Sequence, residues 1–246
     1  MKLDVFYPYD GSVSGQIELA TWADADRAVE IALAGGPMTN HWDRHAVLEN
    51  ARLLLEGRRE EFAASILRET GLCRRETLYE AGRALDVFRF SAVEALREEG
   101  IVLGGDVSPS GKNRKIMTVR EPVKLVLAIT PFNHPLNQVA HKVCPAIAAG
   151  VPVILKPSEK TPLTAFLLAE LLYEAGLPKH MLQVVVGGID DVVTPLIEDP
   201  RVEVVSFTGG TSVGKAIAAR AGYKKVCLEL GGNSPLIIHD DADLDL

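Results

Sequence analysis

The chain has few cysteines and no apolar run long enough to cross a membrane. Its three cysteines, Cys73, Cys144 and Cys227, cannot all pair and lack metal-type spacing, so we expect no metal site and a reducing, cytoplasmic location. The longest apolar stretch, residues 143–155, is too short for a bilayer and is interrupted by prolines and a glycine. The first residues, MKLDVFYPYDGS, lack the basic and apolar architecture of a secretion signal. We therefore expect no membrane partner.

Basic residues are also too sparse to suggest a nucleic-acid partner. The 246-residue chain has a formal net charge of −7 and no dense stripe of lysine and arginine. Its apolar content of 47% is that of a soluble globular protein with a buried core. The ligand is therefore expected to be a small molecule or another protein.

The first hundred residues predict a short hairpin followed by helices. Alternating apolar and polar residues surround Asp10-Gly11, which predicts a turn between two edge strands. Charged residues near the last helix, including Arg83 and Arg89, are expected to form a solvated face. Helical periodicity and capping residues predict four helices. The first runs to Ala34 with Asp24 as its cap, and the second covers 41–56 with Thr39 or Asn40 as its cap. The third follows Gly57 to about residue 70, and the fourth runs from about Arg75 to Glu99.

Residues 104–123 are polar and rich in turn residues, with a short β-like run at 115–120. Such a segment between two well-patterned blocks predicts a ribbon that projects from the body or covers an edge. A projecting ribbon with open edges suits a subunit contact.

Strand-like and helix-like runs alternate regularly from residue 124 onward. This alternation is the signature of a parallel α/β sheet whose apolar strands are buried on both faces. Ligands of such sheets bind beyond the carboxyl ends of the strands. We expect strands at 124–129, 151–155, 182–186, 202–207 and 225–230, with helices at 136–149, 161–175, 190–198 and 212–222.

The stretch VVSFTGGTSVGK, residues 204–215, is an apolar strand that enters a helix through two glycines. The first N–H groups of a helix lack internal partners and lie at the positive end of its dipole, so they bind phosphate. Gly209 and Gly210 remove side chains that would block this approach. Thr211 breaks the G-x-G-x-x-G fingerprint, and Ala216 lacks the hydroxyl with which a P-loop binds magnesium. A simple strand-to-helix turn is the alternative.

Two more polar motifs follow predicted strands. In TPFNHPL, residues 130–136, prolines stiffen the turn and Asn133 can donate to a developing oxyanion; the alternative is an asparagine that satisfies its own turn. In LKPSEKTP, residues 155–162, Lys156 and Glu159 offer a donor and an acceptor to vicinal hydroxyls such as those of a ribose. The alternative is a helix start capped by a hydroxyl side chain.

The motif CLELGGNSP, residues 227–235, places Glu229 between two leucines. Apolar neighbours disfavour the charged form of a carboxylate, which is how a glutamate becomes a general base near neutral pH. The alternative is a structural glutamate that binds a lysine or the backbone. Cys227 shares a strand face with Glu229 but is expected to be a buried, inert thiol.

Together, TPFNHPL, LKPSE, SFTGGTSVG and LELGGNSP closely resemble the aldehyde dehydrogenase superfamily, whose members oxidise an aldehyde with NAD or NADP. The resemblance covers nearly the whole chain, since ETGLCRRETLYEAGRALDVFRF and the ribbon before Val123 resemble that family's helical segment and oligomerisation hairpin. It implies a small aldehyde substrate and a homo-dimer or homo-tetramer. The implied fold is a Rossmann-like parallel sheet with flanking helices, divided into a mainly helical part (1–103), a projecting β-hairpin (104–123), a dinucleotide-binding core (124–232) and the start of a catalytic domain (233–246).

The resemblance also implies roles for individual residues. Asn133 would hold the oxyanion, and Glu229 would activate water for thioester hydrolysis. Lys156 and Glu159 would bracket the adenosine ribose, and Glu159 would disfavour a 2′-phosphate, which favours NAD, with NADP as the alternative. The residues implied to line the cofactor are Thr130, Pro131, Phe132, Phe207, Thr208, Gly209, Gly210 and Val213, with Gly187 near the adenine and Leu230 and Gly231 near the nicotinamide.

The chain departs from the family pattern in three ways. Phe132 stands where many members have a tryptophan whose indole N–H reaches the diphosphate, and Gly210 replaces a common serine that donates to the same phosphates. Cofactor binding is then weaker or carried by backbone N–H groups alone. The family's nucleophile is a cysteine downstream of LELGG, and no cysteine of this chain lies in that motif. The implied reaction, through a cysteine thiohemiacetal in the complete enzyme, is therefore not expected of this chain alone.

Two other functions remain open. One is a protein that binds a dinucleotide without catalysis, and the other is a module that joins subunits through the ribbon. The wording TPFNHPLNQ resembles a branch acting on small or phosphorylated aldehydes, such as lactaldehyde or phosphonoacetaldehyde. The groups that select the aldehyde are expected to lie largely outside this chain.

Overall fold

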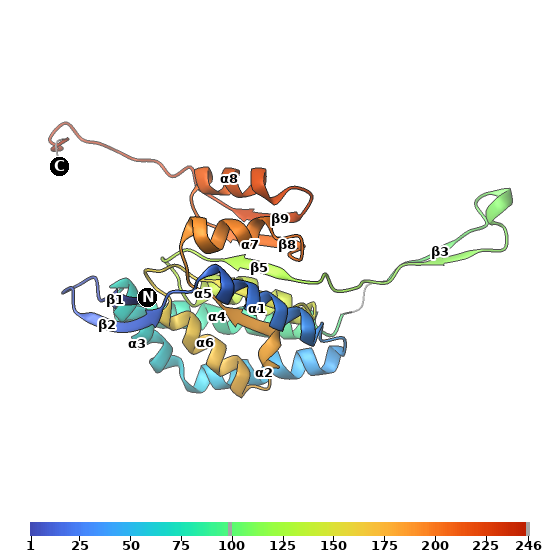
Figure 1. Ribbon diagram of the computed structural model, residues 1–246, viewed down its shortest axis with the longest axis horizontal. Coiled ribbons are helices and arrows are strands. Elements are labelled where there is room, and N and C mark those ends of the chain that lie inside the picture. The colour runs from blue at the N-terminus through green and yellow to red at the C-terminus, as the bar shows by residue number, and fades with distance from the viewer. Residues whose placement is uncertain (98–99, 245–246) are drawn as a thin grey trace.

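The computed structural model describes residues 1–97 and 100–244. A five-stranded parallel sheet with the strand order β7-β6-β5-β8-β9 lies at its centre (Figure 1). Each strand lies within a few residues of its expected place, so the predicted parallel α/β sheet is confirmed. The strands are β5 (Val126–Ile129), β6 (Val153–Lys156), β7 (Leu182–Val184), β8 (Val204–Thr208) and β9 (Lys225–Glu229).

Helices cover both faces of the sheet, and alternate strand residues enter two separate cores. Ala128 of β5 packs in the core beneath α5 and α6, whereas Leu127 packs in the core beneath α1, α7 and α8. A π-helical turn, Ile189–Val193, precedes α7 where a single helix was expected over 190–198. The covering helices are α1 (Trp22–Gly35), α5 (Asn137–Ala148), α6 (Leu163–Glu174), α7 (Thr194–Glu198) and α8 (Thr211–Ala221).

The expectation that every strand is buried on both faces is correct for β5 and β6 and wrong for β9. All residues of β5 and β6 are buried, while those of β9 alternate between exposed and half-buried. The reason is position, because β9 lies at the edge of the sheet beside β8. Edge placement follows from the strand order and not from the strand's own sequence.

The N-terminal segment is a hairpin followed by helices that pack against α5 and α6. Strands β1 and β2 pair antiparallel, and the predicted turn is present with Gly11 at φ 74°. Asn40, and not Thr39, caps α2 by accepting from Trp42 N and Asp43 N at 2.9 and 3.2 Å. The elements are β1 (Lys2–Phe6), β2 (Val13–Glu18), α2 (His41–Gly57), α3 (Arg59–Thr70) and α4 (Arg74–Glu94).

Two predicted helix ends need correction. Thr21, and not Asp24, caps α1, because the Asp24 carboxylate bonds back to Thr21 N at 2.8 Å and forms the second half of a capping box. Helix α4 ends at Glu94, five residues before the predicted end at Glu99, which itself lies outside the described residues.

Two buried glutamates hold the amino ends of sheet helices. Glu80 of α4 accepts from Leu136 N at 2.9 Å and Asn137 N at 3.0 Å, at the start of α5. Glu69 of α3 accepts from Leu163 N and from Thr164 N, at the start of α6. Each carboxylate satisfies helical N–H groups that would otherwise lack partners.

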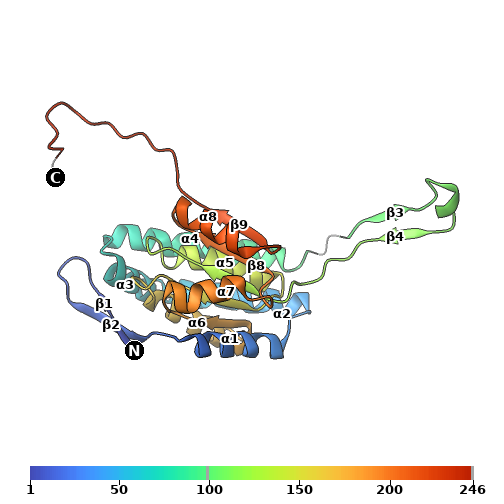
Figure 2. The same ribbon diagram turned by 45° about the horizontal axis from the view of Figure 1, so that its top comes forward.

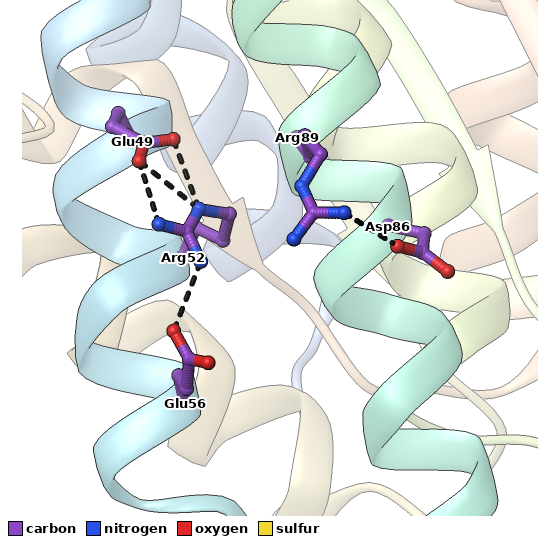
Figure 3. A network of polar contacts seen from close by, with 5 residues as sticks. All are labelled: Glu49, Arg52, Glu56, Asp86 and Arg89. Carbon is purple, nitrogen blue, oxygen red and sulfur yellow. Dashed lines mark hydrogen bonds and ion pairs between the residues drawn. The ribbon is translucent and has the colours of Figure 1, made fainter.

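Helices α2 and α4 carry ion pairs between residues one turn apart. Arg52 lies between Glu49 and Glu56 on α2, at 2.7 and 3.0 Å, and Arg89 faces Asp86 on α4 (Figure 3). The predicted solvated face of the last helix is confirmed, because its arginines, Arg83 among them, are exposed.

A two-stranded ribbon extends away from the body in both views (Figures 1 and 2). Strands β3 (Val102–Gly104) and β4 (Lys115–Met117) pair antiparallel, so the ribbon begins two residues before the expected boundary at 104. Several of its apolar side chains are exposed, including Val107 and Met117. Across residues 1–97 and 100–244, the helices are too short or too polar to cross a membrane.

Candidate functional site

The four strand-end motifs meet along one edge of the sheet. Parallel pairing sets Ile129 of β5 beside both Lys156 of β6 and Phe207 of β8. The next pairing along sets Thr208 beside Glu229. Because the carboxyl ends of these strands are aligned, the loops that follow them form one continuous surface.

The β8–α8 junction has the form of an anion site. Gly210 precedes α8 in an extended conformation, and no side chain caps this helix in the described structure. A Cβ added at Gly210 would meet nothing within 4 Å, so the approach to the first N–H groups is open. Gly209 has a packing reason instead, since its Cβ would lie 2.5 Å from the Phe207 ring.

The remaining residues of this junction pack on α8. Leu230 lies against the helix, because a Cβ at Gly214 would meet Leu230 Cδ2 at 2.3 Å. Gly231 N donates to Thr211 Oγ1 at 3.2 Å, which ties the end of β9 to the start of α8. Val213 is half-exposed on the first turn. Gly187 is distant from this junction and allows close packing, since its Cβ would lie 2.6 Å from Val192 Cγ2.

The loop after β5 combines a buried hydroxyl with exposed side chains. Thr130 is 4% exposed, and its Oγ1 has no hydrogen-bond partner among the described residues. Phe132 is 51% exposed, and Asn133 is exposed beside it. His134 Nδ1 lies 3.3 Å from Glu80 Oε2, so the carboxylate that holds α5 also fixes this loop.

Lys156 and Glu159 contact each other. Lys156 is buried, and its Nζ lies 2.5 Å from Glu159 Oε1. The Glu159 side chain keeps 40% exposure, so its second oxygen remains open to a ligand. The pair therefore presents a neutralised carboxylate, and not a free negative charge, at the end of β6.

Sequence reasoning missed Lys142. This lysine is 8% exposed on α5, and its Nζ donates to Thr208 Oγ1 at 2.8 Å and Ser206 Oγ at 3.2 Å. Burial lowers its pKa, while the neighbouring Glu229 and Cys227 act in the opposite direction. The available signal was a lysine in the mostly apolar predicted helix 136–149.

Two expectations about β9 are wrong. Glu229 is exposed and is not enclosed by its neighbouring leucines, because alternate residues of the strand point to opposite faces. Cys227 is exposed and not buried. Both side chains lie on the face of the sheet that carries Lys142, and this face is open to solvent at the sheet edge. Within the described ranges, no group of three or more histidine, cysteine or acidic side chains could hold a metal ion.

The aldehyde dehydrogenase family model matches residues 1–246. The 3-sulfolactaldehyde dehydrogenase of Priestia megaterium is 43% identical over 245 residues, which cover 99% of this chain and 51% of that protein. The sulfoacetaldehyde dehydrogenase of Neptuniibacter caesariensis is 37% identical over 241 residues, which cover 97% of this chain and 53% of that protein. The chain thus spans about half the length of the relatives it matches.

Solved structures agree in fold. Aldehyde dehydrogenase 21 of Physcomitrella patens, in complex with its product succinate, matches with a TM-score of 0.92 and 36% identity over 96% of this chain and 50% of that one. Betaine aldehyde dehydrogenase of Staphylococcus aureus with NAD+ matches with a TM-score of 0.90 and 32% identity, over 100% of this chain and 50% of that one. The NADP-dependent glyceraldehyde-3-phosphate dehydrogenase of Bacillus halodurans with NADP matches with a TM-score of 0.91 and 33% identity, over 100% of this chain and 52% of that one.

Proposed function

Because the chain belongs to the aldehyde dehydrogenase family, we propose that it is the cofactor-binding part of an enzyme that oxidises an aldehyde to a carboxylic acid. The family uses NAD or NADP, and its solved members hold both. The observation that carries the proposal is the uncapped amino end of α8 beside three other aligned strand-end motifs.

The residues at this edge fit a dinucleotide. Open space at Gly210 admits a phosphate to the N–H groups of α8, and Thr130 Oγ1 is a buried hydroxyl that still lacks a partner. The other proposed cofactor residues are Pro131, Phe132, Lys156, Glu159, Gly187, Phe207, Thr208, Gly209, Val213, Leu230 and Gly231. We propose NAD as the preferred cofactor, because the open carboxylate oxygen of Glu159 can accept a hydrogen bond from a ribose 2′-hydroxyl, which NADP lacks.

When bound, NAD or NADP would supply the hydride acceptor that oxidation of the aldehyde carbon requires. The chain's own residues stabilise charge and move a proton. Asn133, exposed in the bend that follows β5, donates to the oxyanion that forms on the aldehyde oxygen. Glu229 takes the proton of the water that hydrolyses the thioester. Lys142 of α5 donates to Thr208, which pairs with Glu229 across the sheet, and its positive charge interacts electrostatically with the Glu229 carboxylate.

None of the three cysteines is the proposed nucleophile. Cys144 is fully buried, and desolvation raises the pKa of its thiol, so it is not ionised at neutral pH. Cys73 precedes α4 and belongs to none of the four strand-end motifs. Cys227 lies on the site's face but on the same strand as the proposed base. The complete enzyme is proposed to act through a cysteine that forms a thiohemiacetal with the aldehyde.

The two outcomes of one experiment separate binding from catalysis. The 246-residue chain is titrated with NAD+ by calorimetry and then incubated with NAD+ and an aldehyde. We expect saturable NAD+ binding and no reduced cofactor by absorbance. Sustained formation of NADH would show that this chain contains a nucleophile and would refute the proposal that it does not. If the chain bound neither NAD+ nor NADP+, the proposed cofactor role would be refuted.

For the substrate, we propose an aldehyde that carries an anionic group. Named relatives act on sulfolactaldehyde and sulfoacetaldehyde, and a solved neighbour binds succinate. In this chain Arg83 is exposed on α4, one helical turn beyond Glu80, and no carboxylate partner for it is described. Desolvation and the positive charges of Arg83 and Lys142 lower the pKa of the exposed His141, so these cationic side chains act on the same part of the surface.

The matched pair Arg83→Gln and Arg89→Gln tests this substrate class. Both arginines are exposed on α4, but Arg89 already faces Asp86 at 3.5 Å. In an enzyme that contains this chain, R83Q is expected to raise KM for an anionic aldehyde by about tenfold and to leave a neutral aldehyde unaffected. R89Q is the control and changes neither. An equal effect of R83Q on both aldehydes would contradict the proposal.

A second candidate function is assembly. The β3–β4 ribbon projects from the body with exposed Val102, Val107 and Met117, and in a two-stranded sheet both strands are edge strands. We propose that it contacts a second copy of the chain in a homo-dimer or homo-tetramer. Sedimentation of the chain beside a Val102→Lys, Met117→Lys variant checks this, and an unchanged oligomeric state in the variant would exclude the ribbon.

A further inference from the structure

We propose that Lys160 binds the diphosphate of the dinucleotide and that Phe132 holds it in position for this role. The inference rests on the proposed cofactor function. Lys160 Nζ lies 4.8 Å from the centroid of the Phe132 ring. A cation over the face of an aromatic ring is attracted by the ring quadrupole, so this contact restrains a side chain that would otherwise move freely in solvent.

The two residues belong to different strand-end loops that are tied together. Phe132 follows β5 and Lys160 follows β6, and Thr161 Oγ1 donates to Phe132 O at 3.2 Å. Lys160 N donates to Ser158 Oγ at 3.2 Å, which fixes the backbone from which the lysine extends. The ammonium is therefore located by the fold at the carboxyl edge of the sheet.

The charge of Lys160 remains available there. The neighbouring Lys156 is neutralised by Glu159, whereas no carboxylate contacts Lys160 among the residues that the structure describes. Phe132 is half-exposed, so the ring presents the ammonium to solvent and not to the core. Thr130 Oγ1, buried two residues before Phe132, is a second polar group at this edge without a partner. The Lys160 ammonium, which no described carboxylate neutralises, is a charged donor of the kind that binds a phosphate oxygen.

The strand order gives the ligand its shape. β5 lies between β6 and β8, so the Phe132 loop separates Lys160 from the amino end of α8. One phosphate can bind the open N–H groups after Gly210, while a second, linked phosphate extends toward β6 and Lys160. A diphosphate supplies two adjacent negative charges in this arrangement, whereas a single phosphate reaches one end of it.

This arrangement also explains the side chain at position 132. Phenylalanine has no polar hydrogen, so it cannot itself donate to a phosphate. With Lys160 above its ring, the pair supplies three N–H donors and a full positive charge from the same place. Phe132 and Lys160 therefore act as one unit.

Calorimetric titration of the 246-residue chain with NAD+ tests the inference without any turnover. We expect Lys160→Gln to weaken NAD+ binding by about five- to tenfold and Lys160→Arg to weaken it by less than about twofold. Lys179→Gln is the matched control, since Lys179 is an exposed lysine just before β7, at the opposite end of the strands. It should leave the affinity unchanged. Circular dichroism confirms that each variant is folded.

A second variant tests the unit directly. Phe132→Trp restores an aromatic N–H, so the double variant F132W/K160Q should recover NAD+ affinity to within about twofold of the unsubstituted chain. An unchanged affinity in K160Q would overturn the inference, and so would a K160Q defect confined to NADP+, which would place the lysine at the 2′-phosphate. If the unsubstituted chain bound neither dinucleotide, the proposed cofactor function itself would be refuted, and the affinities of the variants would not be needed for that conclusion.

Discussion

Replacing Glu80 by alanine is expected to destabilise the fold more than any surface change on α4. The carboxylate is 2% exposed, and its Oε1 accepts from both Leu136 N and Asn137 N. Its removal leaves two buried N–H groups unpaired at the positive end of α5. Hydrogen bonds to a charged acceptor and a lost helix cap together amount to about 2–4 kcal/mol in the free energy of unfolding. For a chain of this size that lowers Tm by roughly 5–15 °C.

Glu80→Gln separates geometry from charge. A glutamine retains an oxygen at the Oε1 position and can keep both N–H bonds, so only the ionic part is lost, about 1 kcal/mol. Asp86→Ala on the exposed face of α4 is the control and should change the free energy by no more than about 0.5 kcal/mol. Urea unfolding followed by circular dichroism measures all three. Equal losses for E80Q and E80A would refute the argument, because they would show that the two oxygen–amide contacts contribute nothing.

Three further predictions concern a buried glutamate, the cysteines and a glycine. Burial raises the pKa of Glu69, so its contribution to stability is fully present below the unfolded pKa and is lost as the pH rises through the folded pKa. The stability of Glu69→Gln relative to the unsubstituted chain should therefore increase from pH 4 upward. A pH-independent difference between the two proteins in urea unfolding would contradict this. A thiol reagent should titrate the exposed Cys73 and Cys227 rapidly in the native protein and Cys144 only after unfolding, so a fast third thiol would show that α5 opens. Gly35→Ala should cost about 1–3 kcal/mol, because its Cβ would lie 2.1 Å from His180 Cγ, whereas Gly57→Ala, with open space around it, should not destabilise the chain.

The sequence was sufficient for the order of strands and helices because each buried strand is a short apolar run bounded by turn residues. It was also sufficient for the four motifs, since residues that follow parallel strands must gather at one edge. It was insufficient for the exposure of Glu229 and Cys227. That exposure depends on β9 lying at the edge, and a strand's place in a sheet is set by partners distant in the sequence.

The missed contacts have the same origin. Lys142 is satisfied by Ser206 and Thr208, which lie more than sixty residues away in the sequence. Local spacing therefore gives no sign that a lysine on an apolar helix has partners. The choice between Thr21 and Asp24 was different, because both positions of the capping box stand in the sequence three residues apart and could have been identified.

The helices that follow β5, β6 and β8 explain why only one of the three is suited to an anionic ligand. Glu80 already occupies the amino end of α5, and Glu69 that of α6. A second negative charge at either helix would meet a buried carboxylate. The amino end of α8 has no side-chain acceptor in the described parts of the chain, and Gly210 leaves it open. A negatively charged ligand is therefore expected to bind at the amino end of α8 and not at that of α5 or α6.

The substitution Gly210→Asp is expected to raise the stability of the fold and to lower its affinity for NAD+. Gly210 has φ −65° and ψ 145°, which suit a capping side chain, so aspartate should stabilise the fold by a few tenths of a kcal/mol. The same carboxylate would occupy the phosphate position and weaken NAD+ binding by at least about tenfold. Gly210→Ser is the matched variant, because it also caps α8 but is neutral and can donate to a phosphate. If G210D retained normal NAD+ affinity by calorimetry, the diphosphate would have to bind somewhere other than α8.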